Sequence, residues 1–314
     1  MKIGIDLMGG DYAPAEGIEG IQHYFSEEGN AHLIMLGDED KINDLLPGYS
    51  FPADKYSIVH APEVIGYHDS PTRALREKKN SSISVGFHLL ATGKADAFIS
   101  AGNTGAMLVG SLYALKPIEG VLRPTISTII PKENGGTGLL LDVGLNSDCK
   151  PEHLNQFAIM GSVYAQNILG IENPRVALLN IGEEEGKGNL LAQATYPLLK
   201  ENRHINFIGN VEGRDLFLDS ADVMVCDGFT GNVILKLAES LFGITHKKQI
   251  HHEYFERFNF ENYGGTPVLG ISKPVIIGHG ISTGKAFKNM IALAEKMIEK
   301  DVMQKMQAEL VSNE

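Results

Sequence analysis

The chain alternates short apolar runs with longer amphipathic stretches, and this alternation restricts it to few fold classes. The runs predicted to form strands cover residues 2–7, 32–36, 56–60, 95–100, 125–130, 138–143, 175–181, 205–209, 222–226 and 274–277. Helical patterns cover 14–25, 38–46, 81–92, 151–169, 190–201 and 283–310. Apolar strands separated by amphipathic helices are typical of a largely parallel sheet with helices on both faces. The sequence therefore predicts a three-layer α/β/α protein with a mostly parallel sheet, and a single domain over residues 1–314.

Composition excludes several classes of protein. The chain has 314 residues, is 43% hydrophobic and carries a net charge of −12, which argues against a general nucleic-acid-binding surface. Its two cysteines, Cys149 and Cys226, are too few for a disulfide framework and favour a reducing compartment. The first residues run directly into a predicted strand, and no run of eighteen apolar residues occurs. We therefore expect a cytoplasmic protein.

Two loops share the core Gly-x-Thr-Gly, and each lies between a predicted strand and a helical pattern. They are Ser100–Ala106 and Cys226–Asn232. Glycine lets the backbone approach a ligand closely, and the first turn of the following helix offers unpaired amide N–H groups and a positive dipole end. Such a turn suits an anion, above all a phosphate. Glycine-rich turns also serve as plain connections, but the repeated core favours the binding hypothesis.

Further polar, glycine-rich loops follow other predicted strands, at 6–14, 141–148, 180–189 and 209–215. In parallel sheets, ligands bind beyond the carboxyl ends of the strands, so these loops form one predicted rim. We expect several of their side chains to be partners of loop amides rather than ligand contacts. The polar side chains of the rim are Asp6, Asp11, Asn103, Thr104, Asp142, Asn146, Asn180, Lys187, Asn210, Glu212, Asp227, Thr230 and Asn232.

Ten motifs, in order along nearly the whole chain, together resemble one known family. They are Asp6-x-Met-Gly-Gly-Asp-x-Ala-Pro, Lys78-Lys-Asn-Ser-Ser, Ser100-Ala-Gly-Asn-Thr-Gly-Ala, Asp142-Val-Gly-x-Asn, Pro151-Glu-His-Leu, Met160-Gly-Ser-Val-Tyr, Asn180-Ile-Gly-x-Glu, Asn206-Phe-Ile-Gly-Asn-Val-Glu-Gly, Asp227-Gly-Phe-Thr-Gly-Asn and Asn262-Tyr-Gly-Gly. The set resembles the bacterial phosphate acyltransferase family of phospholipid synthesis, the PlsX type.

This resemblance implies an enzyme that transfers an acyl group from acyl carrier protein to inorganic phosphate, and we expect no cofactor. The acyl phosphate would supply a membrane glycerol-phosphate acyltransferase. The resemblance also implies a homodimer and a fold similar to the isocitrate and isopropylmalate dehydrogenases. Two alternatives stay open: a phosphotransacetylase-like enzyme that uses coenzyme A, and a non-catalytic scaffold of the lipid-synthesis machinery.

Phosphate is already largely dianionic near neutral pH, so its attack on a thioester needs positioning and charge stabilisation rather than a strong base. We expect one Gly-x-Thr-Gly loop to hold phosphate and the other to stabilise the thioester oxyanion or a pantetheine phosphate, with the order undecided. The predicted catalytic residues are Asn103, Thr104, Lys187, Asp227, Thr230 and Asn232. The predicted phosphate and substrate contacts are Gly9, Gly10, Gly102, Gly105, Asn180, Asn210, Gly228 and Gly231.

Acyl carrier proteins are strongly acidic, so an acidic enzyme that binds one needs a confined basic face. The predicted docking residues are Arg73, Arg76, Lys78 and Lys79, with Lys247, Lys248 and Arg257 as a second candidate cluster. For each cluster, a solvated helix face is the alternative.

The stretch 242–261 is shorter than the helical excursion that the resemblance leads us to expect. Its aromatic and basic side chains fit either a membrane surface or packing against a partner subunit, and we favour packing.

Other patterns do not fit a nucleotide or metal site. The segment 278–283 lacks the third glycine of a dinucleotide-binding loop, and 280–285 is one residue short of a P-loop. The histidines 246, 251 and 252 lack cysteines or well-spaced carboxylates beside them, so we expect no metal site.

Overall fold

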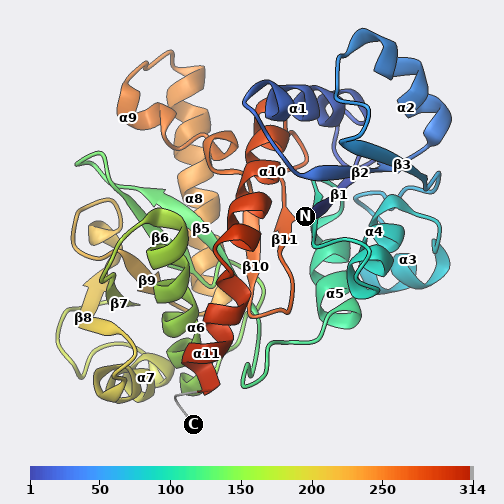
Figure 1. Cartoon of the computed structure of the whole chain (residues 1–314). Helices are drawn as coiled ribbons and strands as arrows, with labels where there is room; N and C mark the ends of the chain where they lie inside the picture. Colours follow the sequence, from blue (N-terminus) through green and yellow to red (C-terminus); the bar gives the residue numbers. More distant parts are fainter. Residues whose placement is uncertain (312–314) are drawn as a thin grey trace. The chain divides into compact units, whose positions relative to one another are not determined.

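The computed structural model describes residues 1–311, which divide into two compact α/β units (Figure 1). Unit 1 comprises Met1–Lys116 and Phe260–Glu299, and unit 2 comprises Pro117–Asn259 with the chain from Lys300 onward. The predicted single domain stays a prediction, because a division by contacts does not show whether either unit folds alone.

Unit 1 is built on strands in the order β3-β2-β1-β4-β11-β10. Neighbouring strands pair in parallel from β3 to β11, and β10 is antiparallel to β11. The strands are β1 (Lys2–Asp6), β2 (His32–Gly37), β3 (Tyr56–His60), β4 (Ala97–Ser100), β10 (Thr266–Leu269) and β11 (Val275–Ile277). The helices are α1 (Ala15–Ser26), α2 (Glu39–Leu45), η1 (Leu46–Gly48), α3 (Pro71–Glu77), α4 (Ser82–Ala91), α5 (Thr104–Ala114), η4 (Phe260–Tyr263) and α10 (Gly284–Glu299).

Helices cover both faces of the strands in unit 1. Figure 1 shows α1 and α10 on one side, and α4 and α5 on the other. Gly20 allows α1 to approach α10 closely, since a Cβ atom there would lie 2.3 Å from the Phe287 Cβ. Burial on both faces explains why the strands read as continuous apolar runs: Ile3, Ile5 and Phe98 have no exposed surface.

Unit 2 has strands in the order β5-β6-β9-β7-β8. β5 is antiparallel to β6, and the remaining pairs are parallel. The strands are β5 (Thr125–Pro131), β6 (Thr137–Leu141), β7 (Arg175–Asn180), β8 (Asn206–Glu212) and β9 (Val223–Val225). The helices are α6 (Pro151–Tyr164), η2 (Ala165–Leu169), α7 (Leu190–Glu201), η3 (Gly213–Asp215), α8 (Gly228–Lys247), α9 (Glu253–Glu256) and α11 (Val302–Val311). In Figure 1, α6 lies in front of the strands with α7 and α11 beside it, and α8 lies behind them.

The predicted α/β class with mostly parallel strands is confirmed in both units. One local prediction is wrong, and several short elements, β10 among them, were not predicted. The single helix predicted over 283–310 is divided into α10 and α11, because Asp301 adopts a left-handed conformation with φ of 51°. Strand β10 was not predicted, because it is only four residues long and contains Pro267, which is unfavourable in strands.

A buried cluster of ion pairs connects three places in unit 2. Arg175 is the first residue of β7, Lys132 follows β5, and Asp222 precedes β9. The Lys132 side chain is 3% exposed, and its ammonium lies 2.6 Å from Asp222 and 2.9 Å from Asp219. The Arg175 guanidinium contacts the same two carboxylates. Burial alone would raise the pKa of Asp222, but hydrogen bonds from Arg175 and Lys132 outweigh it and hold that pKa well below its usual range. Asp222 therefore stays ionised and neutralises a buried lysine.

We predict that Asp222→Ala lowers the free energy of unfolding by about 3 kcal/mol or more, because Lys132 is left buried without its closest counter-charge. Urea denaturation at neutral pH measures the change. Asp219→Ala is the matched control: its side chain is 52% exposed and contacts the same two cations, so we expect a loss of at most about 1 kcal/mol. Equal losses in the two variants would contradict this account.

Candidate active site

The loop between β9 and α8 carries the second Gly-x-Thr-Gly core. Asp227 caps α8: its Oδ1 accepts a hydrogen bond from the Thr230 N–H, and its Oδ2 accepts one from the Thr230 hydroxyl, each at 2.9 Å. The Gly228 N–H donates to the Asn146 carbonyl at 2.8 Å. The Asn232 side-chain amide lies next to Gly144, and no hydrogen bond joins it to another residue that the structure describes. Asp227 and Thr230 thus engage each other, whereas Asn232 keeps its donors available.

A buried carboxylate at the end of β6 fixes the start of α8. Asp142 has no exposed surface, and its two oxygens accept hydrogen bonds from the N–H groups of Gly144, Leu145 and Asn146 at 2.8–3.0 Å. Burial raises the pKa of Asp142, and these hydrogen bonds oppose that rise. Its carbonyl oxygen also lies against Gly231, where a Cβ atom would be only 1.8 Å away. Gly231 therefore permits the contact between α8 and the Asp142 loop.

The loop between β7 and α7 carries Lys187 and is held by two amides. The Asn180 Oδ1 accepts from the Ile181 N–H at 2.9 Å, and its Nδ2 donates to the Lys187 carbonyl at 3.1 Å. The Asn210 Nδ2 donates to the Glu184 carbonyl at 2.9 Å. The Lys187 side chain is exposed, and no ion pair with another described residue engages its ammonium. Asn180 and Asn210 thus shape the loop and leave the Lys187 cation available.

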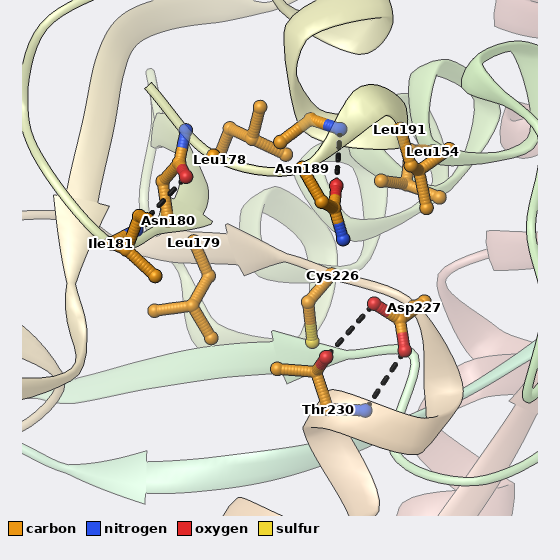
Figure 2. A pocket seen from close by; sticks show the side chains of 12 residues that line it. Leu154, Leu178, Leu179, Asn180, Ile181, Asn189, Leu191, Cys226, Asp227 and Thr230 are labelled. Atoms are coloured by element: carbon orange, nitrogen blue, oxygen red, sulfur yellow. Dashed lines mark hydrogen bonds between the residues drawn. The ribbon is translucent and has the colours of Figure 1, made fainter.

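These two loops border one cavity of about 250 Å³ in unit 2 (Figure 2). It brings together Asn180, Asp227 and Thr230 from the predicted site. Sequence reasoning missed its apolar walls, because Leu and Ala at these positions are indistinguishable from ordinary core residues. The lining residues are Leu154, Leu178, Leu179, Asn180, Ile181, Gly188, Asn189, Leu191, Ala192, Cys226, Asp227 and Thr230.

In unit 1, the first Gly-x-Thr-Gly core opens α5. Asn103 is 5% exposed; its Oδ1 caps α5 by accepting from the Ala106 N–H at 2.9 Å, and its Nδ2 donates to the Gly66 carbonyl at 2.8 Å. Thr104 is exposed as the first residue of the helix, and its hydroxyl has no described partner. Gly105 packs against Pro71, which a Cβ atom would approach to 2.6 Å. The Asn103 side chain is therefore engaged in structure, and Thr104 is accessible.

A second buried carboxylate, Asp6, ties this loop to the end of β1. It accepts from the Met8 N–H at 2.9 Å and from the Ser100 hydroxyl at 2.6 Å, and that hydroxyl in turn accepts from the Gly102 N–H. Burial raises the pKa of Asp6. Gly9 lies directly against Gly102, since a Cβ atom on Gly9 would be 2.6 Å from the Gly102 nitrogen.

The last of the predicted glycine contacts, Gly10, adopts a φ of +106°, which favours glycine over other residues. The close packing of Gly9 and Gly102 and the backbone of Gly10 thus give these three glycines structural reasons to be present.

The four predicted docking residues lie on and just after α3. Arg73 pairs with Glu77 at 2.9 Å, and the Lys78 ammonium lies 2.6 Å from Asp69, whose pKa this hydrogen bond lowers. Arg76 and Lys79 are exposed and make no ion pair with described residues. These two cations are therefore the ones available to a partner.

In the second basic cluster, too, some cations are engaged within the protein and others are exposed. Arg257 donates to the backbone carbonyls of Lys132 and Gly136, whereas Lys247 and Lys248 are exposed at the end of α8.

Comparisons with known proteins agree along almost the whole chain. A family described as fatty acid synthesis protein matches residues 1–305. The chain is 45% identical to a phosphate acyltransferase of Dictyoglomus turgidum, covering 97% of this chain and 96% of the relative. It is 46% identical to a phosphate acyltransferase of Halothermothrix orenii, covering 96% of each. The chain therefore belongs to this family and is an enzyme of the phosphate acyltransferase class, as its motifs predicted.

Solved structures show the same fold at low identity. A phosphotransacetylase from Streptococcus pyogenes matches with a TM-score of 0.66 at 20% identity, over 95% of this chain and 94% of that one. A putative 4-hydroxythreonine-4-phosphate dehydrogenase from Salmonella typhimurium matches with a TM-score of 0.54 at 13% identity, over 94% and 99%. These likenesses support the predicted dehydrogenase-like α/β fold.

Within residues 1–311, no helix combines the length and apolar character that crossing a membrane requires. The same residues contain no cluster of three His, Cys, Asp or Glu side chains arranged to hold a metal ion.

We predict that Gly231→Ala lowers the free energy of unfolding by about 1–3 kcal/mol and reduces activity, because the new methyl group forces α8 away from the Asp142 carbonyl. Gly243→Ala in the same helix is the matched control. No atom lies within 4 Å of its added Cβ, so helix propensity should stabilise it by about 0.5–1 kcal/mol. Thermal unfolding and acyl phosphate formation are the measurements, and a neutral effect at Gly231 would count against the role given to this contact.

Proposed function

We propose that the enzyme transfers a fatty acyl group from an acyl carrier protein thioester to inorganic phosphate, and that the acyl phosphate product feeds phospholipid synthesis. Membership of the phosphate acyltransferase class supports the reaction type. The observation that carries the proposal is the cavity in unit 2, whose lining combines aliphatic side chains with Asp227 and Thr230 of the α8 loop.

The chemistry requires little from the protein beyond position and charge. A phosphate oxygen forms a bond to the thioester carbonyl carbon, negative charge develops on the carbonyl oxygen, and the carbon–sulfur bond then breaks to release the thiolate. Oriented donors and cations stabilise such developing charge more strongly in a site shielded from water than in bulk solvent. In this proposal, the Asn232 amide and the Lys187 ammonium stabilise the negative charge that develops on the carbonyl oxygen. Asp227 holds the Thr230 hydroxyl and the α8 loop in place.

The two Gly-x-Thr-Gly loops have caps of different charge, which favours one assignment. The cap of α8 is Asp227, whose carboxylate repels a dianion, whereas the cap of α5 is the neutral Asn103. The first amides of α5, on Thr104 and Gly105, have no partner within their helix, and the Thr104 hydroxyl is exposed. We therefore assign phosphate to the α5 loop and the thioester carbonyl to the α8 loop.

We predict that Thr104→Val raises the apparent KM for phosphate about tenfold, the effect of losing one hydrogen bond to a charged ligand. Thr230→Val should instead lower kcat, because Asp227 loses one of its two bonds to that residue, while the KM for phosphate changes little. Acyl phosphate trapped with hydroxylamine is the readout.

Thr92→Val is the control for both substitutions, since its hydroxyl donates to the His88 carbonyl on an exposed helix end. Wild-type kinetics in both loop variants would contradict the assignment of phosphate to the α5 loop and of the thioester carbonyl to the α8 loop. Wild-type protein that forms no acyl phosphate at all would leave only the scaffold alternative, and a preference for coenzyme A thioesters would favour a phosphotransacetylase-type reaction.

The proposed docking site for acyl carrier protein is the pair Arg76 and Lys79, whose cations are exposed and unpaired among the described residues. We predict that the double substitution Arg76→Glu and Lys79→Glu raises the KM for acyl carrier protein thioesters about tenfold or more and spares acyl-phosphopantetheine, because opposite charges attract the acidic carrier. The control, Lys41→Glu with Lys94→Glu, makes the same change in net charge at other exposed sites. Equal loss on both substrates would argue against docking there.

We also propose that the enzyme acts as a homodimer. The support is a stripe of exposed apolar side chains along α8, at the spacing of successive helical turns. We propose as well that the enzyme is cytoplasmic and that it contacts a membrane glycerol-phosphate acyltransferase transiently. The stripe consists of Phe229, Val233, Leu237, Leu241 and Ile244.

A further inference from the structure

The cavity in unit 2 has polar groups on its lining, but the structure already engages most of them (Figure 2). The Asn180 amide bonds the backbone of its own loop through both its oxygen and its nitrogen. The Asn189 oxygen caps α7 by accepting from the Ala192 N–H at 2.9 Å. The buried Cys226 thiol lies 3.6 Å from the Asp142 carbonyl oxygen. Asn180 and Cys226 therefore offer little to a polar ligand, whereas the Asn189 side-chain nitrogen has no described partner.

The one charged residue on the lining is Asp227, and Thr230 engages both of its carboxylate oxygens. A phosphate, sugar or nucleotide placed in the cavity would lose its hydration and gain few protein donors in return, which is costly. The remaining walls are the aliphatic side chains of Leu154, Leu178, Leu179, Ile181, Leu191 and Ala192. Such a cavity suits an apolar group that ends in a polar atom near its mouth.

Two large aliphatic side chains are exposed on the loop that borders the cavity. Ile181, at the end of β7, is 81% exposed, and Leu190, at the start of α7, is 85% exposed. Exposed apolar side chains next to an apolar cavity indicate a continuous surface for an extended apolar ligand.

We infer that this cavity binds the methylene groups next to the thioester carbonyl and that the rest of the acyl chain runs over Ile181 and Leu190. The small side chain of Ala192 then determines the cavity volume that is available to the acyl chain. The inference rests on the proposed function, since it places the acyl group of that reaction. Each buried methylene contributes about 0.8 kcal/mol, so a few of them suffice to discriminate strongly between short and long chains.

Ala192→Leu tests the inference, because the larger side chain fills the cavity from its α7 wall. With acetyl, octanoyl and palmitoyl thioesters of phosphopantetheine, we expect kcat/KM for the two longer chains to fall about tenfold or more relative to acetyl. Ala194→Leu is the matched control, since Ala194 lies on the same helix, is exposed and does not line the cavity. If thermal unfolding shows that Ala192→Leu is not folded, the smaller Ala192→Val replaces it, with the same direction of effect.

Direct binding of the fluorescent fatty acid cis-parinaric acid separates this inference from the proposed function. Weaker binding in Ala192→Leu, with unchanged binding in Ala194→Leu, supports the cavity as the acyl site. Unchanged binding in Ala192→Leu, or an equal loss of activity on acetyl and palmitoyl substrates, overturns it. Wild-type protein that forms no acyl phosphate from any thioester overturns the proposed function, and the binding measurement then decides the cavity's role alone.

Discussion

Two buried carboxylates, Asp6 in unit 1 and Asp142 in unit 2, hold the loops on which both glycine-rich bends depend. Each lies where a strand ends, has no exposed surface and satisfies backbone N–H groups of its own loop. Each loop then supports a helix start: Ser100 joins Asp6 to the α5 loop, and the Asn146 carbonyl joins the Asp142 loop to Gly228 of α8. Without these carboxylates, the loop amides would be buried unpaired, at a cost of about 1–3 kcal/mol each.

The same architecture gives the two bends different chemistry. Asn103 caps α5 with a neutral amide, and Asp227 caps α8 with a carboxylate that also takes the Thr230 hydroxyl. A positive helix end capped by a neutral group keeps its attraction for a dianion, whereas an acidic cap already neutralises it. In the proposed function, this difference of one functional group is the reason for placing phosphate at the α5 bend and the thioester carbonyl at the α8 bend.

Apolar surface determines the rest of the site in unit 2. The apolar walls of the cavity come from β7, α6 and α7, and its polar lining residues are Asn180, Asn189, Asp227 and Thr230. Leu178 and Leu154 are core residues by burial, yet Leu191 and Ile181 extend the same apolar surface toward solvent. An acyl group placed there would be shielded from water by these aliphatic side chains.

The sequence by itself determined the α/β class, the strands that end in polar loops, and the family, because alternating apolar runs and ordered motifs are local features of the chain. It also located the two Gly-x-Thr-Gly bends at helix starts. Only the tertiary structure decided which side chains are available. Backbone groups engage Asn103 and Asn180 through both oxygen and nitrogen but engage Asn210 only through its nitrogen, and no described partner engages the side chains of Lys187 and Asn232. The tertiary structure alone revealed the cavity, because hydrogen bonding and empty space depend on residues far apart in the chain.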